Sequence, residues 1–245
     1  MKIAIMQPYF FPYLGYFSLI KNTDFFILLD EVQFMRHGWI ERNRILKPQN
    51  GTQYIQVPLE KHLFNTKIKD IKIKNNEDWK NKILAQLTHY KKKAPFYYET
   101  IKLVQHAFLF TTDNITQWNA HCLKIICDYL NIHLNMFVFS NMNLDIEEPQ
   151  QPDEWALNIC KSLRGGGYNI NIKEYINPEG GIDFFDKNKY KKENIKLRFL
   201  KHHLPFYSQR RGVENFEKGL SIIDVLMFNE KEAVLKMIDD FEFLN

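Results

Sequence analysis

The sequence predicts an α/β fold with a parallel sheet at its core, and three observations near the N-terminus support this prediction. Lys2–Met6 (KIAIM) and Phe25–Leu29 (FFILL) are short, continuously apolar runs of the length expected for buried strands. Between them, Gly15 allows the chain to turn into a short helix over Tyr16–Lys21. Strand, helix and strand in this order indicate a βαβ unit, in which helices cover both faces of a parallel sheet.

Further strands are predicted where apolar residues alternate with polar ones or form short runs. These are Gln53–Leu59, Ile68–Ile73, Asn135–Phe139 and Ile195–Leu200. In Ile68–Ile73 the isoleucines alternate with Lys and Asp, and charged side chains that face water are typical of an edge strand.

Helices are predicted where apolar residues recur every three or four positions. These are Asp78–Tyr90, Pro95–Phe110, Asn114–Leu130, Asp153–Leu163, Leu220–Phe228 and Glu230–Asp240. Asn177–Gly181 (NPEGG) has the composition of a turn. Because no repeat or low-complexity linker divides the chain, we expect one domain over residues 1–245. It has an N-terminal βαβ unit with strands in 1–75, a mainly helical portion in 76–165, and a C-terminal strand with helices in 166–245.

Composition and charge exclude several classes of protein. Hydrophobic residues make up 45% and charged residues 25% of the 245, which is typical of a globular chain and not of a disordered one. The net charge of +4 is dispersed, so we expect no nucleic-acid partner. No apolar run approaches the roughly 18 residues of a membrane span, and Met1–Met6 is too short for a signal peptide. The three cysteines form no C-x-x-C pair and the histidines lack metal-ligand spacing, so we expect a cytoplasmic protein without a metal.

Two polar segments follow the first two predicted strands. Ligands of open parallel sheets bind outside the carboxyl ends of the strands, so we expect both segments at the mouth of one site. In the first segment, the Gln7 amide and the phenols of Tyr13 and Tyr16 supply uncharged donors and acceptors, which suit a neutral polar ligand. The alternative is an aromatic loop that only plugs the end of the sheet.

The second segment begins with Asp30 and carries most of the predicted chemistry. A carboxylate directly after an apolar strand is costly unless it has a partner or faces solvent, and an imidazole titrates near neutrality, so Asp30 and His37 are candidate general bases. Arg42 and Arg44 can bind a diphosphate, and Asn43 can orient a hydroxyl or an amide. Gln33 and Trp39 complete the segment. The alternative is a salt-bridged loop with a surface histidine.

Six stretches, in order along nearly the whole chain, resemble the WbqC-like family of bacterial surface-polysaccharide clusters. They are MKIAIMQPYFFPYLGYF, DEVQF, GWIERNRIL, NPEGG, FYSQ and LSIIDVLMFN. The resemblance implies a protein of O-antigen (lipopolysaccharide) synthesis, with transfer of a glycine or other aminoacyl group onto an amino sugar as the suggested role. It adds Tyr207, Gln209, Ser221 and Asp224 from the last motifs to the candidate substrate-binding residues. One departure is the stretch from Gly165 to Glu174, which is longer and richer in glycine than the family pattern.

A looser resemblance concerns the fold. The loop Phe11–Tyr16 lies where nucleotidyltransferase-like proteins carry H-x-G-H between the first strand and helix, and Tyr13 and Tyr16 replace the two histidines. This likeness implies a nucleotidyltransferase-like (HUP or Rossmann-like) core with additional helices. A phenol is neutral near pH 7, so the two tyrosines can donate hydrogen bonds but not positive charge.

Three functions remain open at this point. The first is an enzyme that transfers an acyl or aminoacyl group, from an acyl carrier protein thioester or from CoA, onto the amine of a nucleotide-linked amino sugar, with Asp30 or His37 as the base. The second is an ATP-dependent enzyme that transfers a nucleotidyl group or activates a carboxylate. The third is a non-catalytic partner in a polysaccharide-assembly complex.

Overall fold

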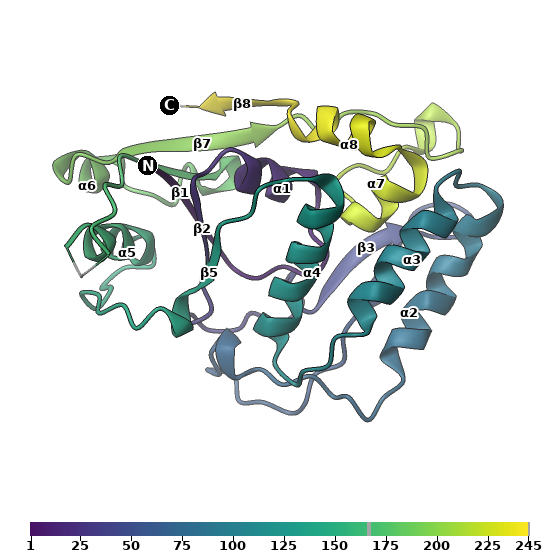
Figure 1. Ribbon diagram of the computed structural model, residues 1–245, viewed down its shortest axis with the longest axis horizontal. Coiled ribbons are helices and arrows are strands. Elements are labelled where there is room, and N and C mark those ends of the chain that lie inside the picture. Colours follow the sequence, from purple (N-terminus) through teal and green to yellow (C-terminus); the bar gives the residue numbers. More distant parts are fainter. Residues whose placement is uncertain (166–167, 245) are drawn as a thin grey trace.

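The computed structural model describes residues 1–165 and 168–244, and a six-stranded sheet lies at their centre (Figure 1). Its order is β5 (Met136–Val138), β2 (Phe25–Leu28), β1 (Lys2–Met6), β6 (Glu174–Pro178), β7 (Lys196–His202) and β8 (Phe241–Leu244). All neighbouring pairs are parallel except β7 and β8, which are antiparallel. The predicted α/β fold with a mostly parallel sheet is therefore confirmed.

The strand order places a topological switch point in the middle of the sheet. Ile3 of β1 pairs with Phe25 of β2 on one side and with Tyr175 of β6 on the other. The chain builds outward from β1 to β2 and β5, then returns to the opposite side of β1 to form β6 and β7. In doubly wound sheets, this point of reversal is where the crevice for a ligand opens.

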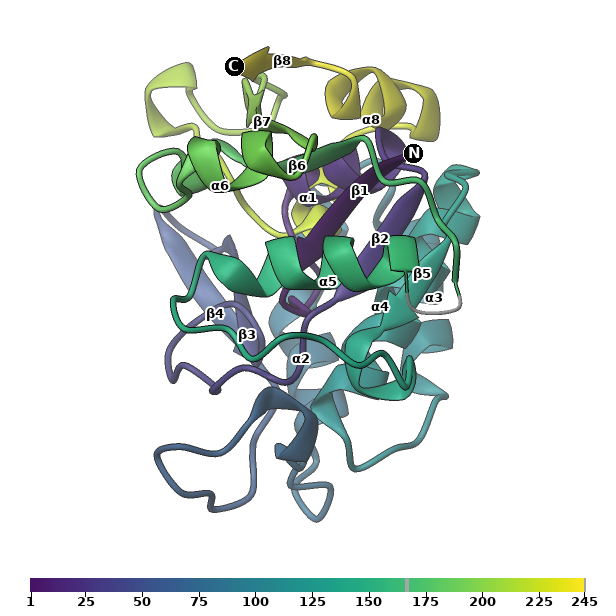
Figure 2. The same ribbon diagram turned by 90° about the vertical axis from the view of Figure 1, so that its left-hand side faces the viewer.

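Two hydrophobic cores pack against opposite faces of the sheet, because successive strand residues point to opposite faces. Ala4 faces the larger core with α1 (Leu14–Lys21), α4 (Ile115–Leu130), α7 (Ile222–Phe228) and α8 (Lys231–Ile238). Ile3 and Ile5 face the smaller core, formed with α5 (Glu154–Gly165) and α6 (Lys187–Lys192). Figure 2 shows α5 running across the front of β1 and β2.

The larger core continues beyond the sheet into a second layer of elements. It includes the antiparallel hairpin of β3 (Arg42–Leu46) and β4 (Thr52–Gln56), together with α2 (Trp79–Leu87) and α3 (Tyr97–Phe108). Short 3-10 turns connect these parts: η1 (Ile68–Asp70), η2 (Thr88–Lys92), η3 (Phe139–Asn141), η4 (Glu179–Gly181) and η5 (Val213–Asn215). The Asn114 side chain caps α4 by accepting a hydrogen bond from the backbone N–H of Gln117 at 3.0 Å.

The edge strand predicted over Ile68–Ile73 is wrong. The segment is η1 followed by an extended stretch with isolated bridges to Leu59 and Asn114, and the side chains of Ile68, Ile71 and Ile73 are all buried. The reason is tertiary: the Lys69 N–H donates to the Asp30 carbonyl, while the Ile71 carbonyl accepts from the Ile115 N–H at the start of α4. The segment therefore lies between the end of β2 and the start of α4, and its three isoleucines are buried there.

Four short elements were not predicted: the strands β3, β6 and β8 and the helix α6. The remaining predicted strands and helices are present with boundaries shifted by a few residues. No helix within the described part of the chain is long and apolar enough to cross a membrane.

Candidate functional site

A cleft of about 860 Å³ opens at the carboxyl ends of β1, β2 and β6, and we call it the main lobe. Met6 and Gln7 reach it from the end of β1, Gln33 from the segment after β2, and Asn177 from the end of β6. The lobe therefore lies at the switch point between β1 and β6, where doubly wound sheets bind their ligands.

The main lobe is aromatic and polar but uncharged. Its rings are Tyr9, Trp155, Tyr175, Phe184 and Phe185, and its amides are Gln7, Gln33, Gln150, Gln151 and Asn177. None of the described residues that line it is Asp, Glu, Lys, Arg or His. A lining of flat apolar faces with a few neutral donors and acceptors fits an uncharged polar ring, such as a sugar or a nucleobase.

A second lobe of about 350 Å³ adjoins the main lobe, and Met6, Tyr9 and Pro178 line both. Tyr13 and Trp39 add aromatic faces to it. Burial above all, with the neighbouring Tyr9 and Glu179, raises the pKa of Tyr13 to about 12. The Tyr13 phenol therefore stays protonated at neutral pH and can act as a hydrogen-bond donor.

Asn43 on β3 links two segments beside the second lobe by hydrogen bonds. Its amide nitrogen donates to the carbonyl oxygens of Phe10 and Phe11 at 3.0 and 2.9 Å, and its amide oxygen accepts from the Arg44 N–H at 2.8 Å. These bonds fix the β1–α1 loop on β3. Asn43 lines the lobe but has both amide hydrogens committed, so its role there is structural support.

Arg44 lies beside the second lobe. Its guanidinium carbon is 5.7 Å from the centroid of the Trp39 ring, and its Nη2 is 3.9 Å from the position that a Gly219 β-carbon would take. Trp39 and Gly219 both line the second lobe. The buried Arg44 Nε has no hydrogen-bond partner among the described residues. A guanidinium at the edge of a neutral cleft is a suitable group for binding an anion.

Arg42 lies on the same face of β3 as Arg44, because residues two apart in a strand point the same way. Its guanidinium carbon lies 4.1 Å from the centroid of Tyr54, and its Nη2 donates to the His37 carbonyl at 2.6 Å. Arg42 therefore braces the loop that carries His37.

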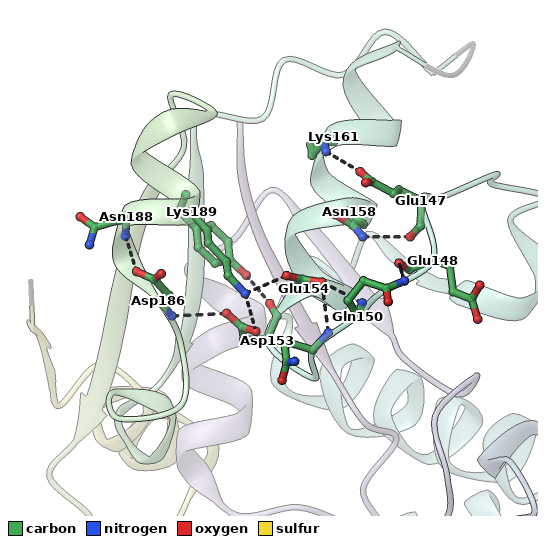
Figure 3. Close-up of polar contacts among 12 residues, drawn as sticks. Glu147, Glu148, Gln150, Asp153, Glu154, Asn158, Lys161, Asp186, Asn188 and Lys189 are labelled. Atoms are coloured by element: carbon green, nitrogen blue, oxygen red, sulfur yellow. Dashed lines mark hydrogen bonds and ion pairs between the residues drawn. The ribbon is translucent and has the colours of Figure 1, made fainter.

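A polar cluster fastens two walls of the main lobe to each other (Figure 3). Lys189 Nζ on α6 lies 3.1 Å from Asp153 Oδ1 and 2.8 Å from Glu154 Oε1 at the start of α5. Glu154 Oε2 accepts from the backbone N–H groups of Gln150 and Gln151 at 2.8 and 3.1 Å. The wall formed by α5 and its preceding segment is thus tied to the one that carries Phe184 and Phe185.

The two predicted bases lie in different surroundings. Asp30 is 1% exposed, and its carboxylate accepts hydrogen bonds from the Ser140 N–H at 3.0 Å and the Ser140 hydroxyl at 2.7 Å. Burial raises the pKa of Asp30, while the two bonds from Ser140 oppose the rise. Asp30 therefore joins β2 to the segment after β5. His37 is exposed and has a φ of 62° in the loop after β2. A catalytic role for either residue stays a prediction.

Five other predicted site residues are buried and bonded to the protein. The Tyr16 hydroxyl donates to the Gln7 carbonyl at 2.8 Å, and the Ser221 hydroxyl donates to the Phe11 carbonyl at 2.8 Å. Asp224 accepts from Tyr207 at 2.5 Å and also from Tyr90, while Gln209 Nε2 donates to the Tyr207 hydroxyl at 3.1 Å. These contacts place α7 against the β1–α1 loop and outside both lobes.

Comparison with known proteins confirms the family that the six sequence stretches predicted. The model of the WbqC-like protein family matches residues 7–236. The chain belongs to the WbqC-like family. It is similar to the uncharacterized protein Rv1507c of Mycobacterium tuberculosis H37Rv, with 29% identity over 231 residues, which cover 93% of each chain. No solved structure matches this WbqC-like chain significantly.

Several residues that line the cleft of this WbqC-like protein were missed from the sequence, Asn177 among them. Asn177 Nδ2 donates to the Tyr175 hydroxyl at 2.7 Å, which leaves its Oδ1 unbonded among the described residues. A β-carbon on Gly181 would lie 2.4 Å from this Oδ1 and 3.0 Å from Phe185 Cε2. The NPEGG turn therefore has glycine where Asn177 and Phe185 need space. The sequence signal that could have identified Asn177 is its position directly after the short apolar pair Tyr175–Ile176.

Proposed function

We propose that this member of the WbqC-like family transfers an acyl or aminoacyl group, such as glycyl, onto the amine of a nucleotide-linked amino sugar. The observation that supports this proposal is the two-lobed cleft itself. An uncharged aromatic and amide-lined lobe adjoins a smaller lobe with Arg44 at its edge. This pairing suits a ligand with a neutral ring at one end and a diphosphate near the other.

In this proposal, the main lobe receives the sugar ring. Gln7, Gln33 and Asn177 supply amide groups for the sugar hydroxyls, and the aromatic side chains pack on its apolar faces. The diphosphate lies toward Arg44. Trp39, which is 38% exposed beside Arg44, offers a face on which the nucleobase stacks.

The chemistry needs an activated acyl donor, which we propose to be a thioester of an acyl carrier protein or of CoA. The amine nitrogen forms a C–N bond with the acyl carbon while the C–S bond breaks. The developing oxyanion needs hydrogen-bond donors, and Tyr13 and Gln7 are the available ones because Asn43 has both amide hydrogens committed. This reaction would place the protein in surface-polysaccharide synthesis in the cytoplasm.

We also propose that the core has the nucleotidyltransferase-like fold within one domain of 245 residues. The strand order supports this fold, but the site favours acyl transfer over nucleotidyl transfer. Tyr13 and Tyr16 replace the histidines, and Tyr16 is fully buried with its hydroxyl bonded to Gln7. Arg44 beside the second lobe is a single cation, and none of the described residues that line either lobe is charged, which suits a diphosphate better than a triphosphate.

The experiment that tests the proposal is a thermal-shift panel with UDP-glucosamine, UDP, ATP and CoA. A ligand at 100 times its Kd stabilises the native state by about 2.7 kcal/mol, which is roughly 5 to 10 °C for a chain of this size. A shift of this order with UDP-glucosamine is expected. A shift with ATP alone would support the carboxylate-activating alternative, and no shift with any nucleotide would support the assembly partner; either result overturns the proposal.

A further inference from the structure

Three large apolar side chains are exposed on two neighbouring segments at the rim of the main lobe. Met35, in the segment after β2, is 59% exposed, and Leu63 and Phe64, in the segment before η1, are 76% and 82% exposed. Single exposed apolar residues are ordinary on a protein surface, but three on neighbouring segments form a patch of the kind that contacts a partner. We call Met35, Leu63 and Phe64 the apolar patch.

Hydrogen bonds hold the two segments against each other while these side chains stay exposed. Gln33 Nε2 donates to the Phe64 carbonyl at 2.8 Å. The Phe34 N–H donates to the Thr66 carbonyl at 2.9 Å, and the Phe34 ring meets the His62 ring edge-on, with their centroids 5.2 Å apart. The backbone under the apolar patch is therefore already ordered, so a partner that binds there loses little free energy to ordering it.

The apolar patch is continuous with the main lobe. Met35 belongs to the patch and also lines the lobe, and Gln33, which lines the lobe, holds the backbone of Phe64. Leu63 and Phe64 are not among the described residues that line either lobe. A partner seated on these two side chains lies beside the mouth of the cleft, and a group that it carries reaches the main lobe past Met35.

The exposed charges around the apolar patch are mainly positive. Lys61 is exposed in the second segment, and within residues 1–165 and 168–244 it has no carboxylate partner. Arg36 is exposed in the first segment and donates to a backbone carbonyl. Glu31 is outnumbered by the two lysines that pair with it, and Glu60 is the one exposed carboxylate in residues 32–37 and 60–67. Apolar side chains with surplus positive charge are complementary to an acidic partner that has an apolar face.

We propose that the apolar patch docks the acyl carrier protein that delivers the acyl or aminoacyl thioester, an inference that rests on the proposed function. Carrier proteins of this class are small and acidic, and they hold the thioester at the end of a flexible arm whose outer part is uncharged. Leu63 and Phe64 pack against the apolar face of the carrier, and Lys61 pairs with its carboxylates. The arm enters the main lobe past Met35, and about 860 Å³ of aromatic and amide-lined space has room for its end beside a sugar ring.

The test measures carrier binding and nucleotide-sugar binding separately. Calorimetry gives the Kd of a bacterial holo acyl carrier protein, and that of UDP-glucosamine, for the wild type, Phe64→Ala and Lys61→Glu. Leu109→Ala and Lys102→Glu are the matched controls, because Leu109 is 77% exposed, Lys102 is exposed on α3, and neither is among the described residues that line a lobe. Phe64→Ala and Lys61→Glu are each expected to weaken carrier binding at least about tenfold, while the two controls bind the carrier like the wild type.

The Kd for UDP-glucosamine is expected to stay unchanged in all four variants, which also shows that they are folded. A wild type that binds UDP-glucosamine but not the carrier, or equal carrier binding by all variants, overturns the docking surface but leaves the proposed function with CoA as the donor. Failure of the wild type to bind UDP-glucosamine overturns the proposed function itself.

Two further measurements address other occupants of the apolar patch. Binding to vesicles of phosphatidylglycerol and phosphatidylcholine that is lost in Phe64→Ala would assign the patch to a lipid surface. A dimer in light scattering that Phe64→Ala dissociates would assign it to a second copy of this chain. Either result overturns the carrier proposal, whereas a monomer that ignores vesicles and binds the carrier through Phe64 supports it.

Discussion

The phenol ring of Tyr13, the residue before helix α1, lies directly against Gly15, the second residue of that helix. A β-carbon on Gly15 would lie 2.5 Å from Tyr13 Cε2 and 3.1 Å from the β-carbon of His202. Glycine at position 15 therefore leaves space for the Tyr13 ring, which lines the second lobe. It does so although glycine has a lower helix propensity than alanine.

Gly15→Ala is expected to destabilise the protein and to move Tyr13 into the second lobe. Alanine adds about 1 kcal/mol of helix propensity, but a contact as short as 2.5 Å with the ring places the overlap cost in the upper part of the range of about 1 to 3 kcal/mol, so a net loss of about 1 to 2 kcal/mol is expected. Urea unfolding measures the difference. Gly165→Ala is the control because a β-carbon there meets no atom of the described residues within 4 Å. A Gly15→Ala variant as stable as the wild type would show that Tyr13 is not held in this place.

The sequence predicted the centre of the sheet and part of the cleft. β1 and β2 are continuously apolar, so the βαβ unit and the position of Gln7 and Gln33 at one edge followed from the sequence. β6 was missed because only Tyr175 and Ile176 are both buried and apolar in it, and without β6 the switch point could not be located.

The rest of the site depends on packing between distant segments. Trp155 reaches the main lobe from α5 and Phe184 from the turn before α6, and neither segment carries a motif for binding. The family resemblance made Tyr207, Gln209 and Asp224 candidate substrate-binding residues, yet they bond to each other in the interior. A sequence pattern does not distinguish a buried polar network from an exposed one.

Gly181→Ala is expected to weaken UDP-glucosamine binding, because the new β-carbon displaces Asn177 and Phe185 from the wall of the main lobe. Gly180→Ala is the matched control, since a β-carbon on this neighbouring glycine meets none of the structurally described residues within 4 Å. Calorimetric Kd values are expected to rise at least about tenfold for Gly181→Ala and little for Gly180→Ala. Equal effects of the two substitutions would argue against recognition by Asn177.

Lys189→Met is expected to loosen the wall of the main lobe. The ion pairs of Lys189 are partly exposed, so their loss is expected to have a modest effect and to raise the Kd for UDP-glucosamine about two- to fivefold. Lys161→Met removes a comparable pair, 2.8 Å to Glu147, from α5 outside the cleft. Only Lys189→Met is expected to change the Kd; a Kd that changes equally in both variants would indicate a general effect of α5.

The buried Asp224 is expected to make stability depend on pH. Burial raises its pKa to about 6, although Tyr207 and Tyr90 oppose the rise. The raised pKa means that the native state holds the proton more tightly than the unfolded state. The resulting stabilisation is fully present below about pH 4 and is lost as the pH rises through about 6, a change of about 3 kcal/mol.

Asp224→Asn removes this titration, so urea unfolding of the wild type and the variant at pH 4 and pH 7 isolates it. The stability of the wild type relative to the variant is expected to be about 2 kcal/mol greater at pH 4 than at pH 7, because pH 4 is close to the unfolded pKa of 3.8 and the full difference is not yet reached. A difference that is the same at both pH values would mean that Asp224 titrates normally.

Calorimetric titration of UDP-glucosamine into the wild type, Arg44→Met and Arg36→Met tests the proposed nucleotide-sugar site most directly. Arg36 is an exposed arginine that lines neither lobe and serves as the control. Loss of charge-assisted hydrogen bonds from Arg44 to the diphosphate is expected to weaken binding about 10- to 100-fold, while Arg36→Met binds like the wild type. Equal affinity in all three proteins, or no binding by the wild type, would contradict a nucleotide-sugar site in this cleft.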